Sequence, residues 1–99
     1  MGGEPMFGSV MIGRSTAPVE VMRSIVNDWA DTIGAAAGFI DERALVTEDG
    51  RVVVCVRFAD RASYERLADD PAQSAWWDST LRPMLDGDPD WIDGTWHDI

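Results

Sequence analysis

Aromatic side chains are the first group in this chain of 99 residues that could recognise a ligand, because it holds five tryptophans and one tyrosine. Trp29, Tyr64, Trp76 and Trp77 all fall in segments with helical spacing. A cluster of this kind beside a sheet would stack against a flat aromatic ligand, whereas packing in the core is the alternative role for each ring. Asn27, in the first helical segment, is a candidate polar contact, and its alternative is a solvated helix residue.

Two arginines in the predicted sheet, Arg43 and Arg57, are candidates for an anionic ligand group. The expected strand register places Arg57 opposite Glu42 and so predicts a cross-strand ion pair. In that register the two arginines lie on opposite faces of the sheet, so one points toward the helices and the other away from them. The arginine on the helix side is the candidate partner for an oxyanion, and a structural ion pair is its alternative.

His97 is the only histidine in the chain, and a histidine suits acid–base chemistry near neutral pH. Its alternative is an exposed residue or a subunit contact at the end of the last strand. The aspartates at 69–70 and 86–90 are predicted to be helix caps and turns, because their order does not match a calcium-binding loop. The sequence has no zinc spacing, phosphate-binding glycine loop or nucleophile elbow, so we predict no metal site.

Composition excludes some classes of partner. Eighteen acidic residues against eight basic ones leave a net charge of −10, which repels nucleic acid and anionic lipid. No stretch approaches the ~18 apolar residues of a membrane span, and the first residues lack the basic start of a secretory signal. We therefore expect a cytoplasmic protein with a single domain over residues 1–99, in which residues 1–5 form a flexible tail.

The elements that must position these side chains centre on a hairpin. Asp49-Gly50 separates two β-rich runs, and this dipeptide favours a two-residue type I′ turn. With that turn, Leu45 lies opposite Val54 and Arg43 opposite Val56. The run 52–56 is apolar at every position, which is typical of a strand covered on both faces.

The remaining periodicity predicts the order strand, helix, strand, strand, helix, helix, strand. Asp60 is the expected cap of the second helix, and Asp70-Pro71 restarts a third helix that ends near 81 or 82. The third helix should bury Ala72, Ala75, Trp76 and Leu81. The expected ranges are 6–13, 18–33, 39–48, 51–59, 61–68, 71–82 and 91–99.

This order predicts an α+β, ferredoxin-like split βαβ fold: a four-stranded antiparallel sheet with helices on one face. The other face would still carry apolar side chains. Pairing two such sheets across a two-fold axis covers them, so we expect a homodimer.

The segments Gly38-Phe39-Ile40, Val52 to Phe58, and Asp60 to Leu67 resemble the core pattern of the dimeric α/β-barrel superfamily, in its antibiotic-biosynthesis-monooxygenase-like branch. The resemblance implies an obligate dimer with a pocket between the sheet and the helices of each protomer. Members include cofactor-free monooxygenases of quinone-type compounds and haem-degrading enzymes.

Haem degradation does not fit this chain. Those members use a histidine from the helical region, an asparagine on the first strand and a tryptophan near the second helix. Here the histidine is His97 on the last predicted strand, the first strand offers Ser9, and the helix position holds Leu67.

We therefore expect a small-molecule-binding dimeric barrel protein that acts, without a cofactor, as a monooxygenase of phenolic or quinone-like substrates. The alternative is a non-catalytic dimeric binding or stress-type protein. A cavity of ~300 Å³ or more lined by an arginine and a tyrosine would favour the enzyme. The candidate binding residues are Asn27, Trp29, Arg43, Arg57, Tyr64, Trp76, Trp77 and His97.

Overall fold

A computed structural model describes residues 6–97 of the chain. The expected flexible tail at residues 1–5 lies outside the described residues, as do positions 98 and 99. The elements follow the predicted order: β1 (Phe7–Arg14), α1 (Val19–Ile33), β2 (Phe39–Val46), β3 (Arg51–Phe58), α2 (Arg61–Ala68), α3 (Pro71–Trp76), the π-helical turn η1 (Trp77–Leu81), the 3-10 turn η2 (Arg82–Met84) and β4 (Asp90–Thr95).

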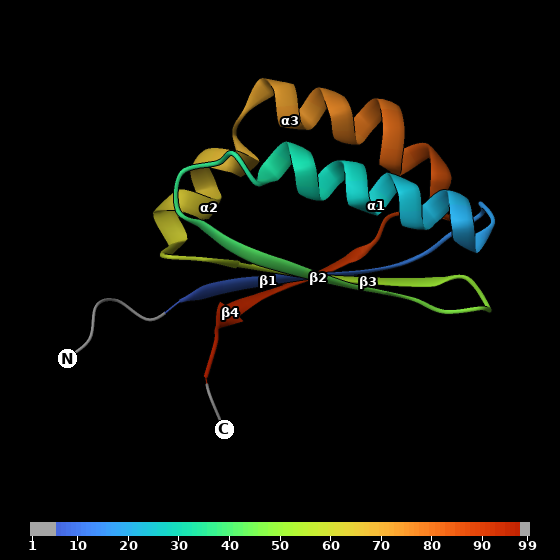
Figure 1. The fold of residues 1–99 in the computed structure, drawn as a ribbon, viewed down its shortest axis with the longest axis horizontal. Helices are drawn as coiled ribbons and strands as arrows, with labels where there is room; N and C mark the ends of the chain where they lie inside the picture. The colour runs from blue at the N-terminus through green and yellow to red at the C-terminus, as the bar shows by residue number, and fades with distance from the viewer. Residues whose placement is uncertain (1–5, 98–99) are drawn as a thin grey trace.

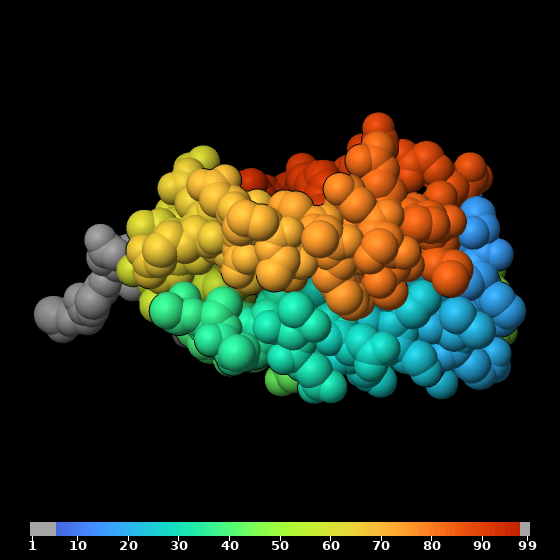
Figure 2. All heavy atoms as spheres, turned by 90° about the horizontal axis from the view of Figure 1, so that it is seen from above, coloured from blue at the N-terminus to red at the C-terminus, as the bar shows by residue number. Residues whose placement is uncertain are grey.

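The four strands form one antiparallel sheet in the order β2-β3-β1-β4. All helices lie on one face of it, and α1 and α3 run side by side along its length (Figures 1 and 2). This confirms the ferredoxin-like α+β fold predicted from the sequence.

The core lies between this sheet and the helices. α1 buries the stripe Met22, Ile25, Val26, Trp29 and Ile33, because these positions recur every three or four residues on one side of the helix. The opposing sheet surface is the valine-rich side of β3. Val52, Val54, Val56 and Phe58 are all buried there.

Local cap signals start the two later helices. The Asp60 carboxylate accepts a hydrogen bond from the Ser63 backbone N–H (2.8 Å), and the Asp70 carboxylate accepts one from the Ala72 N–H (2.8 Å). Each bond satisfies a donor that the first helical turn leaves unpaired. Both caps confirm the sequence-based placement of α2 and α3.

The predicted hairpin register is wrong by one residue. The turn has three loop residues rather than two: Thr47 pairs with Arg51 through its backbone N–H (2.9 Å), and Gly50 closes the loop with φ +95°. Ala44 therefore lies opposite Val54, and Arg43 lies opposite Cys55. A shift of one residue turns every side chain of β2 to the other face.

This shift changes the charged pairs. Arg43 and Arg57 both point to the open face of the sheet, away from the helices, so the expectation that one of them faces the helices is wrong. Arg57 forms its ion pair with Asp41 (Nε to Oδ1, 2.7 Å) rather than with Glu42. Glu42 turns instead to the helix side, opposite the buried Val56.

The second half of the helical region and the last strand also differ from the prediction. Ala72 and Ala75 are exposed rather than buried, whereas Leu81 is buried as predicted. The π-helical turn η1 comes after Ala75 and ends at Leu81, so the regular helical spacing on which the prediction rested does not hold from 72 to 81. β4 ends at Thr95, so His97 lies beyond the strand.

The open face of the sheet carries apolar side chains. Leu45 is 60% exposed and Ile92 is 57% exposed on the two edge strands. Trp96 lies across Gly8 on this face: a Cβ on Gly8 would fall 1.9 Å from the indole Nε1. Glycine is therefore required in β1, because the tryptophan ring occupies the space of a side chain.

Candidate functional site

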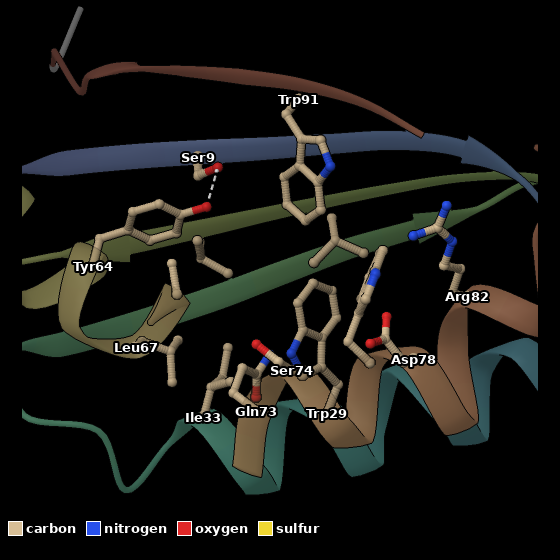
Figure 3. Close-up of a pocket in the computed structure, with 14 residues that line it drawn as sticks. Ser9, Trp29, Ile33, Tyr64, Leu67, Gln73, Ser74, Asp78, Arg82 and Trp91 are labelled. Carbon is tan, nitrogen blue, oxygen red and sulfur yellow. Dashed lines mark hydrogen bonds between the residues drawn. The ribbon is translucent and has the colours of Figure 1, made fainter. Parts of the chain in front are cut away.

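A cavity of about 300 Å³ lies between the sheet and the helical layer (Figure 3). Residues from β1, β3 and β4 form one wall, and residues from α1, α2, α3 and the turns after α3 form the other. Its lining is Ser9, Trp29, Ile33, Val54, Val56, Tyr64, Leu67, Ala68, Gln73, Ser74, Trp77, Asp78, Arg82 and Trp91.

Tryptophans build much of this lining. The ring of Trp77 lies 5.6 Å from that of Trp29 and 5.5 Å from that of Trp91, measured between centroids. Trp91 enters from the sheet, because its position opposite Met11 turns it to the helix side (Figure 3). Trp76 stacks on Trp29 at 6.0 Å and is not part of the lining. Indole faces at these separations suit a flat, aromatic ligand.

Tyr64 lines the cavity together with a buried polar group. Its hydroxyl lies 3.2 Å from Ser9 Oγ, and Ser9 Oγ lies 2.6 Å from Asp93 Oδ1. Burial raises the pKa of the Tyr64 phenol, the hydrogen bond with Ser9 lowers it, and the Asp93 charge raises it. Tyr64 therefore remains a neutral phenol at physiological pH.

Two charged residues, Asp78 and Arg82, line another part of the cavity, away from Tyr64 (Figure 3). Asp78 belongs to η1 and Arg82 to η2, and both side chains are exposed to solvent. Arg82 Nη2 donates to Asp88 Oδ1 (2.6 Å), which holds the guanidinium in place. The cavity thus combines an apolar interior with a cation near solvent.

Two polar atoms of the lining residues lack a hydrogen-bond partner. They are Nε1 of Trp29, a residue only 5% exposed, and Oε1 of Gln73. A buried group of this kind costs about 1–3 kcal/mol when it stays unpaired. One is a donor and the other an acceptor, so each could pair with a polar group of a ligand.

The structure places three of the eight predicted site residues in the cavity lining: Trp29, Tyr64 and Trp77. The other five lie elsewhere. Asn27 is exposed on α1 and lines a separate hollow, and Trp76 packs behind Trp29. Arg43 and Arg57 face the open side of the sheet, and His97 is exposed after β4.

Six lining residues with polar or aromatic groups were not among the predicted candidates. Asp78 lies within the π-helical turn η1 and Arg82 directly follows it, and the spacing of apolar residues does not reveal this turn. Side chains alternate between the two faces along β1 and β4. This alternation would have placed Ser9 and Trp91 on the helix side if the pairing of the two strands had been known. The set is Ser9, Gln73, Ser74, Asp78, Arg82 and Trp91.

Fold and cavity together define a ferredoxin-like domain with a ligand-sized, aromatic-lined pocket under its helices. No protein-family model matches the chain, and no curated protein matches it either. Solved structures do. The chain is similar to SnoaB from Streptomyces nogalater, described as a cofactor-independent oxygenase, with TM-score 0.84, 14% identity and 97% of each chain covered.

Two further structures have the same fold. A putative antibiotic biosynthesis monooxygenase from Nitrosomonas europaea has TM-score 0.78 and 11% identity, covering 96% of this chain and 94% of the other. A DABB family protein with a ferredoxin-like fold from Mesorhizobium loti has TM-score 0.76 and 18% identity, covering 96% and 100%. These likenesses confirm the ferredoxin-like fold that the resemblance seen in the sequence implied.

Two other findings concern residues 6–97. None of the helices there is long and apolar enough to cross a membrane. Within the same range, no group of three or more histidine, cysteine, aspartate or glutamate side chains is arranged to hold a metal ion.

Proposed function

We propose that the protein binds a small phenolic or hydroquinone-like compound in the helix-side cavity and oxygenates it with molecular oxygen. The observation that carries this proposal is the cavity of about 300 Å³ lined by three tryptophans, Tyr64 and Arg82. That volume is at the lower end for small-molecule sites. A cavity of this size lined by an arginine and a tyrosine is also the feature that, in the sequence analysis, favours an oxygenase over a non-catalytic binding protein.

The reaction requires no electron donor besides the substrate. A hydroquinone and O₂ yield a hydroxyquinone and water: one oxygen atom enters the ring, the other leaves as water, and the ring supplies all the electrons. The protein must bind the ring, favour its deprotonated form and exclude water. The indole walls serve the first and third needs.

In this proposal Arg82 favours the deprotonated form of the substrate ring. A guanidinium beside the developing oxyanion stabilises the negative charge, and its fixed bond to Asp88 limits the reorganisation required. Arg82 therefore takes the role that the sequence assigned to Arg43 or Arg57. Trp29 Nε1 and Gln73 Oε1 would orient the ring through its hydroxyl group.

We also propose that two copies pair through their open sheet faces. Exposed Leu45 and Ile92 and the apolar side of the central strands support this arrangement, since a monomer would leave them in water. The net charge of −10 argues against nucleic acid as a partner. We place the protein in the cytoplasm, where a free thiol such as Cys55 remains reduced.

Oxygen consumption tests the activity. We expect the wild-type protein to increase oxygen uptake above the spontaneous rate with at least one member of a panel of substituted hydroquinones. Arg82→Ala should lower kcat/KM by roughly tenfold or more, because it removes one stabilising cation. Arg23→Ala, at an exposed arginine on α1 outside the cavity, is the matched control.

Addition of catalase separates this reaction from autoxidation. Autoxidation makes hydrogen peroxide, from which catalase returns half of the oxygen consumed, whereas oxygenation with water as the second product returns none. No uptake above the spontaneous rate for any panel member would remove the proposed activity. Binding without uptake would favour the non-catalytic binding protein instead.

A further inference from the structure

Three polar side chains from three elements form a continuous hydrogen-bonded chain at the tyrosine side of the cavity. Tyr64 projects from α2 toward Ser9 on β1 (Figure 3), and Ser9 in turn contacts Asp93 on β4, at 3.2 Å and 2.6 Å respectively. Ser9 is 1% exposed, so it has access to few other partners. Asp93 is exposed to solvent.

The order of donors in this chain follows from the chemistry of its members. A carboxylate only accepts hydrogen bonds, and a serine hydroxyl has a single hydrogen to donate. Ser9 therefore donates to Asp93, and Tyr64 donates to Ser9. The Tyr64 hydrogen points away from the cavity, which leaves lone pairs of its oxygen to accept a hydrogen bond from a bound hydroxyl.

The two ends of the chain lie in different environments. Tyr64 lines the cavity, whereas Asp93 is exposed to solvent. Deprotonation inside a pocket that excludes water requires a route for the proton, and hydrogen-bonded hydroxyl groups supply such a route. Because Tyr64 is a neutral phenol, it can accept one proton only while it passes its own proton on, and it does not act as a base by itself.

We propose that Tyr64, Ser9 and Asp93 form a proton relay that deprotonates the bound substrate and delivers its proton to solvent. At the substrate hydroxyl that faces Tyr64, the O–H bond breaks as the proton moves to Tyr64 Oη, the Tyr64 proton moves to Ser9 Oγ, and the Ser9 proton moves to Asp93 Oδ1. Arg82, in the other part of the cavity, lies beside the second oxygen of the hydroquinone. The products are a substrate oxyanion and a neutral Asp93 carboxyl, which then releases the proton to water. No electrons are transferred in this step.

This inference rests on the proposed oxygenase function and adds roles that the cavity lining alone does not assign. Tyr64 contacts the substrate and is the catalytic residue of the three. Ser9 and Asp93 act through Tyr64 and are positioning residues. Asp78 is the other carboxylate beside the cavity, and it is the competing proton acceptor that the experiment must separate.

Turnover by conservative variants tests the relay. With a hydroquinone that the wild-type protein oxygenates, we expect Asp93→Asn and Ser9→Ala to reduce kcat by about 10²-fold, the usual contribution of general-base catalysis. Substrate affinity, measured by calorimetry under nitrogen, should change by less than about threefold, because Trp29 and the other walls are intact. Asp90→Asn, on the same strand but facing the open side of the sheet, is the control and should match wild type.

Rescue separates a relay from a structural contact. Formate should restore turnover to Asp93→Ala, because this exposed position admits a small carboxylate that replaces the missing acceptor. Formate should not restore Ser9→Ala, in which the chain is broken at its buried centre. A merely structural Asp93 would show no rescue. Unchanged turnover in Asp93→Asn together with a loss in Asp78→Asn would assign the proton to Asp78 and overturn the relay.

The single tyrosine of the chain allows a second readout that does not depend on turnover. Tyrosinate absorbance reports the ionisation of Tyr64 alone. Asp93 on β4 is the charged group that raises the pKa of Tyr64; Asp78 and Arg82 face the same cavity from η1 and η2, and Arg61 on α2 lies over the Phe7 ring. We expect Asp93→Asn to lower the midpoint of this titration, with no change in Asp90→Asn.

These outcomes distinguish the two proposals. Absence of oxygen uptake by the wild-type protein would remove the oxygenase function and the relay with it. Wild-type uptake that is unaffected in Asp93→Asn and Ser9→Ala, or a tyrosine titration that is the same in all variants, would remove the relay and leave the oxygenase function standing.

Discussion

Glu42 illustrates how the position of one side chain sets a property of the whole protein. Its carboxyl lies on the helix side of β2, and Oε2 is buried without a hydrogen-bond partner. Burial raises the pKa of Glu42 from 4.5 to about 7. The side chain is thus a neutral acid over part of the range in which most carboxyl groups are ionised.

The raised pKa predicts a specific dependence of stability on pH. Below pH 4.5 Glu42 is protonated in both the folded and the unfolded chain, so it imposes no penalty. As the pH rises toward 7, the unfolded chain releases this proton first, and the folded state loses stability until Glu42 ionises there as well. Because solvent partly screens the carboxyl, we expect a loss of about 1–2 kcal/mol.

Urea denaturation at pH 5 and at pH 7.5 measures this effect. The free energy of unfolding of Glu42→Gln should exceed that of wild type at pH 7.5 by more than it does at pH 5. Asp41 and Asp60, whose pKa values are lowered by their hydrogen bonds to Arg57 and Ser63, titrate below this window and do not contribute. An equal difference at both pH values would contradict the prediction.

At the scale of elements, Gly38 controls how α1 is joined to β2. Its backbone has φ +85°, a conformation that costs about 1–2 kcal/mol for other residues. A Cβ at this position would also fall 2.2 Å from Ser63 Oγ, at the start of α2. The turn and the helix therefore share a space that only glycine fits.

We predict that Gly38→Ala lowers the free energy of unfolding by about 2–4 kcal/mol, which combines backbone strain with the displacement of Ser63. Gly94→Ala is the control, because a Cβ there meets nothing within 4 Å and its φ is not positive. Thermal unfolding followed by circular dichroism gives the comparison. Equal midpoints for the two variants would show that the turn relaxes without cost.

The same scale shows why some elements could be predicted from the sequence and others could not. Asp60 and Asp70-Pro71 are local signals, and they placed the starts of α2 and α3 correctly. The hairpin depends on a competition between turns of two and three residues around Gly50, and both turns accept Asp-Gly. Contacts with the rest of the fold determine which turn forms. The turn that forms determines on which face of the sheet each side chain of β2 lies.

The site was predictable to a similar extent. Helical periodicity assigned Trp29 and Tyr64 to the side of their helices that faces the sheet, and both residues line the cavity. Arg82 could not be identified, because its direction follows from the π-helical turn η1, which inserts extra residues per turn without a sequence signature. Trp91 depended on pairing with β1, a contact between distant parts of the chain.

At the scale of the molecule, the sheet has one covered and one open face. The helices cover the first (Figure 1), and the second presents Leu45 and Ile92 to solvent in a single chain. Burying such side chains contributes on the order of 1.5–3 kcal/mol each. Pairing of two copies through this face would remove these side chains from water, which supports the proposed dimer.

We predict that the protein sediments as a dimer at micromolar concentration and that Val53→Lys, at the centre of the open face, shifts it to a monomer. Val21→Lys is the matched control: Val21 is 41% exposed but lies on the helical layer, so this variant should remain dimeric. Analytical ultracentrifugation distinguishes the species. A folded wild-type monomer at this concentration would contradict the pairing.

The tryptophans of the cavity have a practical consequence. Three of the five indoles line it, within 6 Å of one another along the series Trp29, Trp77 and Trp91. A quinone accepts electrons from an excited indole and so extinguishes its fluorescence on contact. Tryptophan fluorescence therefore reports binding of a quinone in the cavity. A compound library can be screened for ligands by emission intensity alone, before any reaction has been identified.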